Sequence, residues 1–593
     1  MPQRPLPRAQ RRYADATSVA QSLPLPRLVD HLQYPTLGAP ALVEVAATLQ
    51  CVVSLDEGVG PSEVTLALVA RHGDGGRHGL RFEAEALDDG VEGGRRLYEL
   101  RASLEGIPAA LYDLALEGLA EPEVQPNAVR VFEQITGDEL VVFCGDSQLH
   151  DGNTQCLERF VARMNDADNE EVAWIALIGD VCDNGVKGET NAMRLALKAK
   201  ASEVSHYYDF EYPTAHRILA KLHKPILLMP GNHDGMVAYA RYGAGERTNV
   251  VVGPDPKNDV AYDGLQHFAR TFGPLHHAFD WGGTRYLCTN TYELNRHDRL
   301  GFHCVVTNWG GWMQDSQIAW LDAELADAHA SGLGAVVLMH HDPRGGSLGR
   351  KLGQYHLFRP YDFDEVGAAV LAYLRYLAKR RNVTFQQEWM ADFGVDLVDH
   401  PARRILESLA KHHVHAVVMG HDNLNWVDTY DEGDDLLSAP SSTTRKALFD
   451  DDRELGSPEI EALRELLEKG AMEEALAILD GLPPERRDAL LAQALPDAGD
   501  ARVVTAASDD EATSEAGKPV FDLSDRVDYA VLAEAPLHFV HVDDIGAYRH
   551  SEETDFDDYG YVKARLSGGK PVYLEGVTMR GAESASVDLI VEE

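Results

Sequence analysis

The pattern of hydrophobic and polar positions differs between several stretches of the chain. Between residues 40 and 135, short segments with partly alternating apolar residues are separated by turn-forming sequences such as GDGG and DDGVEGG. Alternation with a period of two is typical of strands that bury one face, and closely spaced turns favour a β-sandwich. We therefore predict a small all-β sandwich domain over residues 39–135. The proline-containing lead over residues 1–38 is expected to be disordered.

From about residue 138 the pattern changes to continuous apolar runs that end in polar residues. The runs are LVVFCGD, VAWIALIGD, PILLMPGNHD, GAVVLMHHD and VHAVVMGHD, with helical or loop segments between them. Such runs are typical of buried strands in an α/β sheet, where ligands bind beyond the carboxyl ends of the strands. We assign residues 136–446 to an α/β domain of this kind.

Residues 447–518 differ again, because they are strongly acidic. From residue 451 to 518, 7 Lys and Arg stand against 18 Asp and Glu, a local net charge of 7 − 18 = −11. Ser457 followed by Pro458 predicts a helix start, since serine caps helices and proline fits their first turn. We interpret this stretch as an acidic insertion, partly helical and partly disordered. Strand patterns resume over residues 519–593, which we expect to complete the α/β domain.

Charge and cysteine content exclude some classes of function and indicate a cellular compartment. The 593 residues include 54 Lys and Arg and 96 Asp and Glu, giving a net charge of −42. A charge of this sign repels nucleic-acid backbones and anionic lipid, so general nucleic-acid binding and membrane docking are excluded. A small phosphorylated substrate remains compatible, because a bound metal reverses the field locally. The six cysteines form no CxxC pair and no apolar run spans a membrane, so we expect a cytoplasmic protein.

Metal-ligand residue types follow five of the apolar runs in a fixed order. The blocks are Gly145-Asp146-Ser147-Gln148, Gly179-Asp180-Val181-Cys182-Asp183, Gly231-Asn232-His233-Asp234, His340-His341 and Gly420-His421-Asp422-Asn423. This order resembles the calcineurin-like metallophosphoesterase superfamily, as does the helix motif at Gln317, Trp320 and Leu321. The resemblance covers about residues 138–446 and the closing strands. It implies a four-layer α/β/β/α catalytic domain that hydrolyses phosphoesters.

The resemblance also implies roles for the motif residues. Two divalent metals share Asp180, and a hydroxide that bridges them attacks phosphorus. Metal 2 takes Asn232, His340 and His421, whereas metal 1 takes Asp146, Gln148 and Asn423. His233 acts as general acid or transition-state donor and is oriented by Asp234. We expect Asp183 to bind substrate, and His341 either to bind substrate or to support the metal ligands.

The two adjacent histidines need a choice between them. Neighbouring residues on a strand point to opposite faces, so we expect only one of the pair to bind metal. His340 directly follows the apolar run, and we favour it over His341 as the metal 2 ligand.

Two motifs depart from the family pattern. The first usually reads Asp-x-His and the last Gly-His-x-His, but Gln148 and Asn423 replace the second histidines here. Both changes fall on metal 1, which keeps only oxygen ligands. Such a set favours Mn²⁺, Mg²⁺ or Ca²⁺ over Zn²⁺. We expect two divalent ions, with Mn²⁺ first and Mg²⁺, Fe, Zn²⁺ or Ca²⁺ as alternatives; a decayed metal 1 site is the rival interpretation.

The leading sandwich resembles the arrangement in purple acid phosphatases and alkaline phosphodiesterases. Asp183 occupies the position of the tyrosine that binds redox iron in the purple enzymes, so a purple centre is not indicated. We expect hydrolysis of a phosphomonoester or phosphodiester of a small molecule, a nucleotide included. The alternatives are a protein phosphatase, with the acidic insertion as its docking element, and a non-catalytic metal-binding scaffold. The oligomeric state is not assigned.

Overall fold

The structure of the protein is a computed structural model. It describes residues 31–72, 76–92, 95–150, 153–182, 210–234, 238–239, 260–261, 265–293, 313–344, 401–421, 426–436, 445–447, 531–542, 544–545, 560–579 and 583–589. The acidic insertion predicted over residues 447–518 lies outside these ranges, apart from its first residue. No helix in this part of the chain is both long and apolar enough to cross a membrane.

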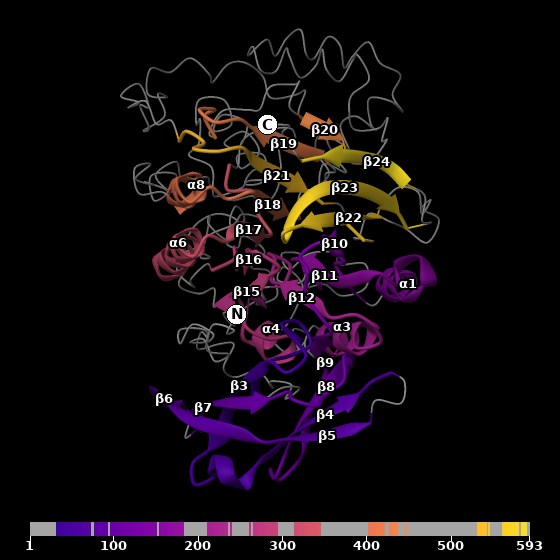
Figure 1. The fold of residues 1–593 in the computed structure, drawn as a ribbon, viewed down its shortest axis with the longest axis vertical. Coiled ribbons are helices and arrows are strands. Elements are labelled where there is room, and N and C mark those ends of the chain that lie inside the picture. Colours follow the sequence, from indigo (N-terminus) through magenta and orange to yellow (C-terminus); the bar gives the residue numbers. More distant parts are fainter. Residues whose placement is uncertain are drawn as a thin grey trace, which may run out of the picture.

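The N-terminal domain consists of two sheets (Figure 1, indigo). One has the order β1 (Leu32–Tyr34), β3 (Thr48–Asp56), β7 (Arg95–Ser103), β6 (Phe82–Glu92). The other has the order β2 (Ala41–Glu44), β9 (Glu123–Phe132), β8 (Leu111–Glu117), β4 (Thr65–Ala70), β5 (Arg77–Leu80), and a short 3-10 helix, η2 (Pro61–Glu63), precedes β4. Inward-facing residues of both sheets, such as Leu49, Leu100 and Leu114, share one apolar core.

The sandwich begins earlier than the sequence suggested. The expected disordered lead ran to residue 38, but β1 pairs antiparallel with β3. Leu32 and Leu37 are fully buried. Their burial stabilises residues 31–38 against the sandwich, so the boundary at residue 39 was wrong. Residues 1–30 lie outside the described ranges.

Backbone hydrogen bonds join the sandwich to the rest of the protein. The amide of Gly38 donates to the carbonyl of Phe272 (2.8 Å), and the amide of Leu228 donates to the carbonyl of Gly38 (2.8 Å). A Cβ at Gly38 would lie only 2.8 Å from the Phe272 carbonyl oxygen, so a glycine is needed for this approach. The side chain of Asn127 adds a bond to the carbonyl of Leu222 (2.9 Å). The sandwich is therefore joined to the second domain by backbone hydrogen bonds and by the side chain of Asn127.

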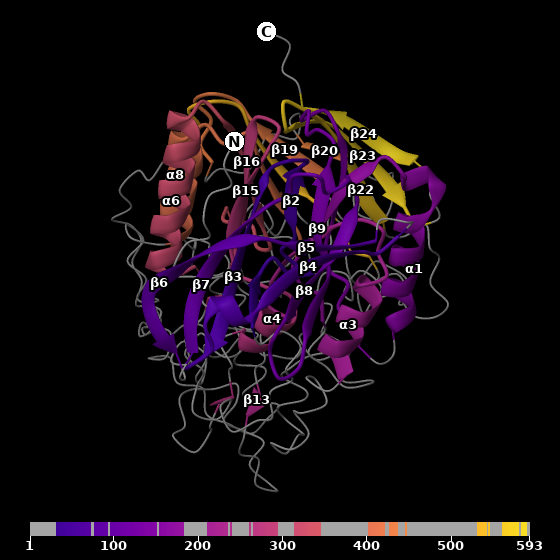
Figure 2. The ribbon, with the colours of Figure 1, turned by 60° about the horizontal axis from the view of Figure 1, so that its bottom comes forward.

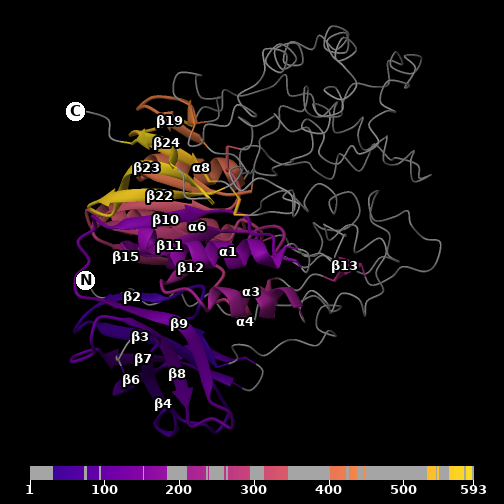
Figure 3. The same cartoon turned by 90° about the vertical axis from the view of Figure 1, so that its right-hand side faces the viewer.

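Two larger sheets form the second domain. The six-stranded sheet has the order β12 (Ile226–Met229), β11 (Val172–Ile178), β10 (Leu140–Cys144), β22 (Gly560–Ser567), β23 (Lys570–Thr578), β24 (Glu583–Asp588). Strands β10, β11 and β12 run parallel. The C-terminal strands continue this sheet in antiparallel fashion from β10 (Figure 3, yellow).

The seven-stranded sheet has the order β15 (His277–Trp281), β16 (Thr284–Cys288), β17 (Gly334–Met339), β18 (Ala416–Met419), β21 (Leu537–His541), β19 (Trp426–Tyr430), β20 (Arg445–Ala447). Its central strands β16, β17, β18 and β21 are parallel. A separate two-stranded ladder joins β13 (Ala238–Tyr239) and β14 (Val260–Ala261).

One apolar core lies between the two large sheets. Trp174 of β11 contacts Trp281 and Tyr286 of the opposite sheet, with ring centroids 6.1 and 5.1 Å apart. Helices α6 (Asp315–Ala330) and α8 (Pro401–Lys411) cover the outer side of the seven-stranded sheet (Figures 1 and 2). Ile318, Leu321 and Leu325 bury one face of α6 at the three-to-four-residue spacing of an amphipathic helix.

Among the described residues, three further α-helices lie by the six-stranded sheet (Figure 1): α1 (Thr154–Asn165), α3 (Tyr212–Leu219) and α4 (Gln266–Thr271). A short 3-10 helix, η3 (Ala167–Asn169), follows α1. Phe160 of α1 packs edge-on against Tyr561 of β22, with ring centroids 6.3 Å apart. The second domain is thus a mixed α/β structure.

Candidate metal centre

The predicted motif residues lie at the carboxyl ends of five parallel strands. Asp146 follows β10, Asp180 follows β11, Asn232 follows β12, His340 follows β17 and His421 follows β18. Because parallel strands end at the same edge of a sheet, these residues meet where the two large sheets face each other. All five are buried.

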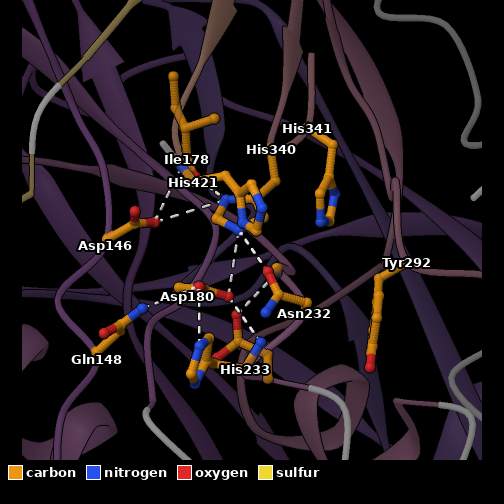
Figure 4. Close-up of polar contacts among 12 residues, drawn as sticks. Asp146, Gln148, Ile178, Asp180, Asn232, His233, Tyr292, His340, His341 and His421 are labelled. Atoms are coloured by element: carbon orange, nitrogen blue, oxygen red, sulfur yellow. Dashed lines mark hydrogen bonds and ion pairs between the residues drawn. The ribbon is translucent and has the colours of Figure 1, made fainter. Parts of the chain in front are cut away.

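Asp180 lies at the centre of this group (Figure 4). Its Oδ1 accepts the backbone amide of His233 (2.8 Å) and lies 3.3 Å from Nε2 of His340. Its Oδ2 accepts Nε2 of Gln148 (3.2 Å) and lies 4.0 Å from Nε2 of His233. Contacts from three other motifs therefore converge on one carboxylate, which is the position expected of a bridging ligand.

The backbone is strained at the same residues. Asp146, Gln148, Asp180 and His421 have φ angles of 23°, 36°, 53° and 73°, in the left-handed region that residues other than glycine rarely adopt. Each such conformation costs on the order of 1–3 kcal/mol, and clusters of them are typical of functional sites. The strand ends are therefore held in an unfavourable conformation that aims these side chains at one point.

Glycines allow the close packing around the imidazole of His340. A Cβ at Gly179 would overlap that ring, and a Cβ at Gly231 would overlap Oδ1 of Asp180. The motif glycines are thus required by contact between strand ends and not only by turn geometry.

The ring of His340 is oriented as a metal ligand would be. Its Nδ1 lies 2.8 Å from the carbonyl oxygen of Ile178, which can only accept, so Nδ1 carries the proton of this bond. Its Nε2 faces Oδ1 of Asn232 at 3.2 Å. A backbone carbonyl on the far nitrogen is the usual partner of a ligating histidine.

His341 does not point to the opposite side, as the strand alternation had predicted. The ring centroids of His340 and His341 are 4.8 Å apart. The ligand atoms of His340, His341 and His421 all lie within 4.8 Å of one another. The prediction failed because β17 ends at Met339, so the pleat no longer sets the direction of the next two side chains.

Electrostatics at the site favour a cation. Burial raises the pKa of Asp146 well above its usual range, although His340 opposes this shift. Burial also raises the pKa of Asp180, but His340 and His233 outweigh it and hold that pKa below its usual range. Burial lowers the pKa of His340, but Asp180 and Asp146 outweigh it and raise the pKa to about 9. Burial thus opposes a second negative charge beside Asp180, and a bound cation would stabilise the ionised form of Asp146.

Unpaired polar atoms support a metal in this position. Oδ2 of Asp146 and Oε1 of Gln148 are buried and have no hydrogen-bond partner within the described part of the chain. Ligand atoms of Asp146, Asp180 and His340 lie within 4.8 Å of one another and form a second candidate group. Oxygen and imidazole donors of this kind suit divalent metals, so the residues present fit a metal centre.

Asp234 contacts the backbone of two strand-end loops. Its Oδ2 accepts the amides of Gly231 (2.9 Å) and Val181 (3.1 Å), and its Oδ1 accepts the amide of Cys182 (2.9 Å). The carboxylate therefore fastens the loop after β11 to the loop after β12. That Asp234 also orients His233 stays a prediction. Asp183 and Asn423 lie outside the described residues.

Sequence reasoning assigned no role in the site to the segment after β16. The hydroxyl of Thr291 lies 2.7 Å from Nδ1 of His341. Gln317 of α6 holds the preceding residue, because its amide accepts the backbone amide of Asn290 (2.8 Å) and donates to its carbonyl (2.7 Å). The polar sequence Thr289-Asn290-Thr291 at a strand end was the available signal.

The family comparison agrees with the motif reading. Residues 140–424 match the family model described as calcineurin-like phosphoesterase. Over 133 residues the chain is 30% identical to the glycerophosphodiester phosphodiesterase GpdQ of Enterobacter lignolyticus (strain SCF1). That stretch is 22% of this chain, and it spans 36%, about a third, of the length of this relative.

Two solved structures align over most of the chain, but loosely. A purple acid phosphatase, PPD1, from yellow lupin (Lupinus luteus) seeds has a TM-score of 0.38 at 11% identity, covering 91% of this chain and 72% of that one. PhoD has a TM-score of 0.36 at 8% identity, covering 96% and 90%. Both scores are too low to identify the whole chain with either structure.

Proposed function

Because residues 140–424 belong to the calcineurin-like phosphoesterase family, we propose that this chain is a metal-dependent hydrolase of a small-molecule phosphodiester. The observation that carries the proposal is the convergence of Gln148, His233 and His340 on the buried carboxylate of Asp180. A shared carboxylate is what a two-metal phosphoesterase site requires.

The ligands divide into two sets around Asp180. Asn232, His340 and His421 would hold one metal, and Asp146 and Gln148 would hold the other together with Asn423. When bound, divalent metals lower the pKa of water and neutralise charge that develops on a phosphate. We propose Mn²⁺ for the oxygen-only set, since it lacks imidazole.

His233 is placed to move a proton. Its backbone amide is fixed by Asp180 (2.8 Å), and its side chain is 11% exposed, whereas that of Asp180 is 1% exposed. A residue whose main chain is anchored beside the site and whose ring is partly exposed can donate to a leaving-group oxygen. We assign His233 this role, and we keep substrate contact as the proposal for Asp183.

A diester is preferred because the 30% identical relative is a phosphodiesterase. A phosphomonoesterase, a protein phosphatase that docks through residues 447–518, and a non-catalytic scaffold are the alternatives. The four-layer α/β/β/α assignment, the acidic insertion and a cytoplasmic location belong to the same proposal.

A substrate panel on the full chain tests this function. Protein stripped of metal is reconstituted with Mn²⁺, Mg²⁺, Zn²⁺ or Ca²⁺ and assayed on bis-p-nitrophenyl phosphate, p-nitrophenyl phosphate and a phosphopeptide. We expect the diester to react fastest and Asp180→Asn to abolish turnover with the fold retained. Asp322→Asn is the control, because Asp322 bonds Ser408 and His412 on the outer helices.

Each other outcome selects a rival. Faster turnover of p-nitrophenyl phosphate would indicate a monoesterase, and faster turnover of the phosphopeptide a protein phosphatase. If the protein bound metal but hydrolysed none of the three substrates, the non-catalytic scaffold would be the supported alternative.

A further inference from the structure

We propose that His341 is a third imidazole ligand at the metal position of His340 and His421. This inference rests on the metal centre of the proposed function. It changes the expected role of His341 from contact with substrate or support of the metal ligands to coordination of metal.

The three rings form one buried cluster (Figure 4). Ring centroids are 4.8 Å apart for His340 and His341, 4.4 Å for His341 and His421, and 5.0 Å for His340 and His421. Their ligand atoms lie within 4.8 Å of one another. Since metal–imidazole bonds are about 2.0–2.1 Å long, two atoms on one ion are at most about 4 Å apart. Small side-chain shifts would therefore bring all three nitrogens onto one ion.

The two neighbouring histidines have similar surroundings on their far side. Nδ1 of His340 meets the carbonyl oxygen of Ile178 at 2.8 Å, and Nδ1 of His341 meets the hydroxyl of Thr291 at 2.7 Å. Each partner comes from another strand end, after β11 and after β16. An oxygen on the nitrogen remote from the metal is what fixes the ring of a ligating histidine.

The backbone supports the same orientation. The amide of His341 also donates to the hydroxyl of Thr291 (3.3 Å), so this one oxygen holds both the main chain and the ring. The ring of Tyr292 stacks at 6.4 Å with an interplanar angle of 20°. These contacts limit rotation of His341 away from the other two imidazoles.

A three-imidazole position has a consequence for metal selectivity. Imidazole favours Zn²⁺, Fe, Ni²⁺ or Cu²⁺, whereas amide and carboxylate oxygens favour Mn²⁺, Mg²⁺ or Ca²⁺. Because Asp146 and Gln148 supply only oxygen on the other side, we expect two different metals in the working protein. The histidine position should bind its ion more tightly.

Co²⁺ titration of metal-free full-length protein tests the inference without any assay of activity. We expect His341→Ala to lower Co²⁺ affinity at the tighter site by at least the roughly 10–100-fold seen for loss of a supporting residue. Thr291→Val removes only the hydroxyl that holds the ring and should cause a smaller loss. If His341→Ala does not fold, the Co²⁺ affinity of Thr291→Val tests the inference in its place.

Two variants control for general effects on folding. His538 is equally buried but lies near the amino end of β21, and Thr289 is a buried threonine whose hydroxyl bonds the Leu338 carbonyl (3.0 Å). His538→Ala and Thr289→Val should leave Co²⁺ affinity unchanged.

Proton NMR of the Co²⁺ protein provides a direct reading. A ligating imidazole gives a strongly shifted, exchangeable N–H signal, so we expect three such signals, one of which His341→Ala removes. Two signals in the wild type with unchanged affinity in His341→Ala would overturn the inference and leave the proposed function standing. A wild-type protein that binds no Co²⁺ would overturn both.

Discussion

The guanidinium of Arg344 is paired inside the protein with the carboxylate of Asp342, with Nη2 2.7 Å from Oδ2. Arg344 also reaches Oδ2 of Asp428 (3.1 Å) and the hydroxyl of Tyr430 (3.1 Å), and stacks over the ring of Phe539 at 4.0 Å. The pair lies just after the two histidines that follow β17 and joins this segment to β19 and β21. This network therefore fixes the turn that carries two imidazoles of the metal centre.

We predict that Arg344→Met destabilises the fold by about 3–5 kcal/mol, because it leaves buried carboxylates without their cation. Metal affinity should fall as well, since the turn loses its attachment. Arg285→Met is the control: Arg285 is buried against Asp280 and Asp327, but at the amino end of β16, away from the site. Urea unfolding and calorimetry measure both effects. Equal loss of metal affinity in the two variants would contradict the positioning role.

Removal of the Asp234 carboxylate should loosen two metal-bearing loops together. In Asp234→Ala the amides of Gly231, Val181 and Cys182 lose their acceptor, at a cost of about 1–3 kcal/mol for each buried donor that stays unpaired. Asp234→Asn keeps one oxygen and should cost less. The urea midpoint and bound metal per chain are the readouts. A stable alanine variant with full metal content would show that the clamp is unimportant.

His233→Ala should separate catalysis from metal binding. We expect bound metal to be retained and the rate on bis-p-nitrophenyl phosphate to fall by roughly 10²–10⁴, as for loss of a general acid. Metal analysis and steady-state kinetics on the same preparation make the distinction. Loss of metal in this variant would mean that His233 is a ligand instead.

The oxygen-only metal position should be the weaker one. Purified protein is expected to carry fewer than two equivalents of metal and to gain activity when Mn²⁺ is added. Oε1 of Gln148 has no partner within the described residues. Gln148→His together with Asn423→His should therefore raise retention of Zn²⁺, because imidazole binds it better than a neutral amide does. Unchanged affinity in titration calorimetry would exclude these two positions as ligands.

Buried histidines make the fold sensitive to acid. Burial lowers the pKa of His277 from 6.5 to about 4, and neither ring nitrogen has a hydrogen-bond partner within the described chain. In the unfolded chain, His277 binds a proton below about pH 6.5. In the folded chain, it binds that proton only below about pH 4. Stability is therefore lost as the pH falls through this window, by up to about 3 kcal/mol from this residue.

His277→Leu should reduce that loss without leaving a partner unpaired. His276 and His538, whose pKa values burial also lowers to about 3, keep part of the sensitivity. Urea midpoints at pH 7 and pH 4.5 measure the effect. A variant that loses as much stability as the wild type between these values would assign the acid response to other groups.

The sequence by itself indicated which motif residues form the site and that they lie at strand ends. Each of the five follows an apolar run (Asp146, Asp180, Asn232, His340 and His421), and parallel strands of one sheet end at the same edge. The family-like motif at Gln317, Trp320 and Leu321 likewise predicted a helix, and α6 contains all three residues. Local pattern decides such features, because they depend on residues that are close along the chain.

Only the tertiary structure decided how the chain turns after each strand. His341 meets His340 because β17 ends at Met339, a boundary that periodicity does not locate. Asp234 fastens two loops, and Arg344 joins β17 to β19 and β21, through contacts between residues separated by about 50 to 200 positions. A buried charge or carboxylate takes whichever partners the packed strands bring within hydrogen-bond distance, and that choice is made only when the sheets assemble.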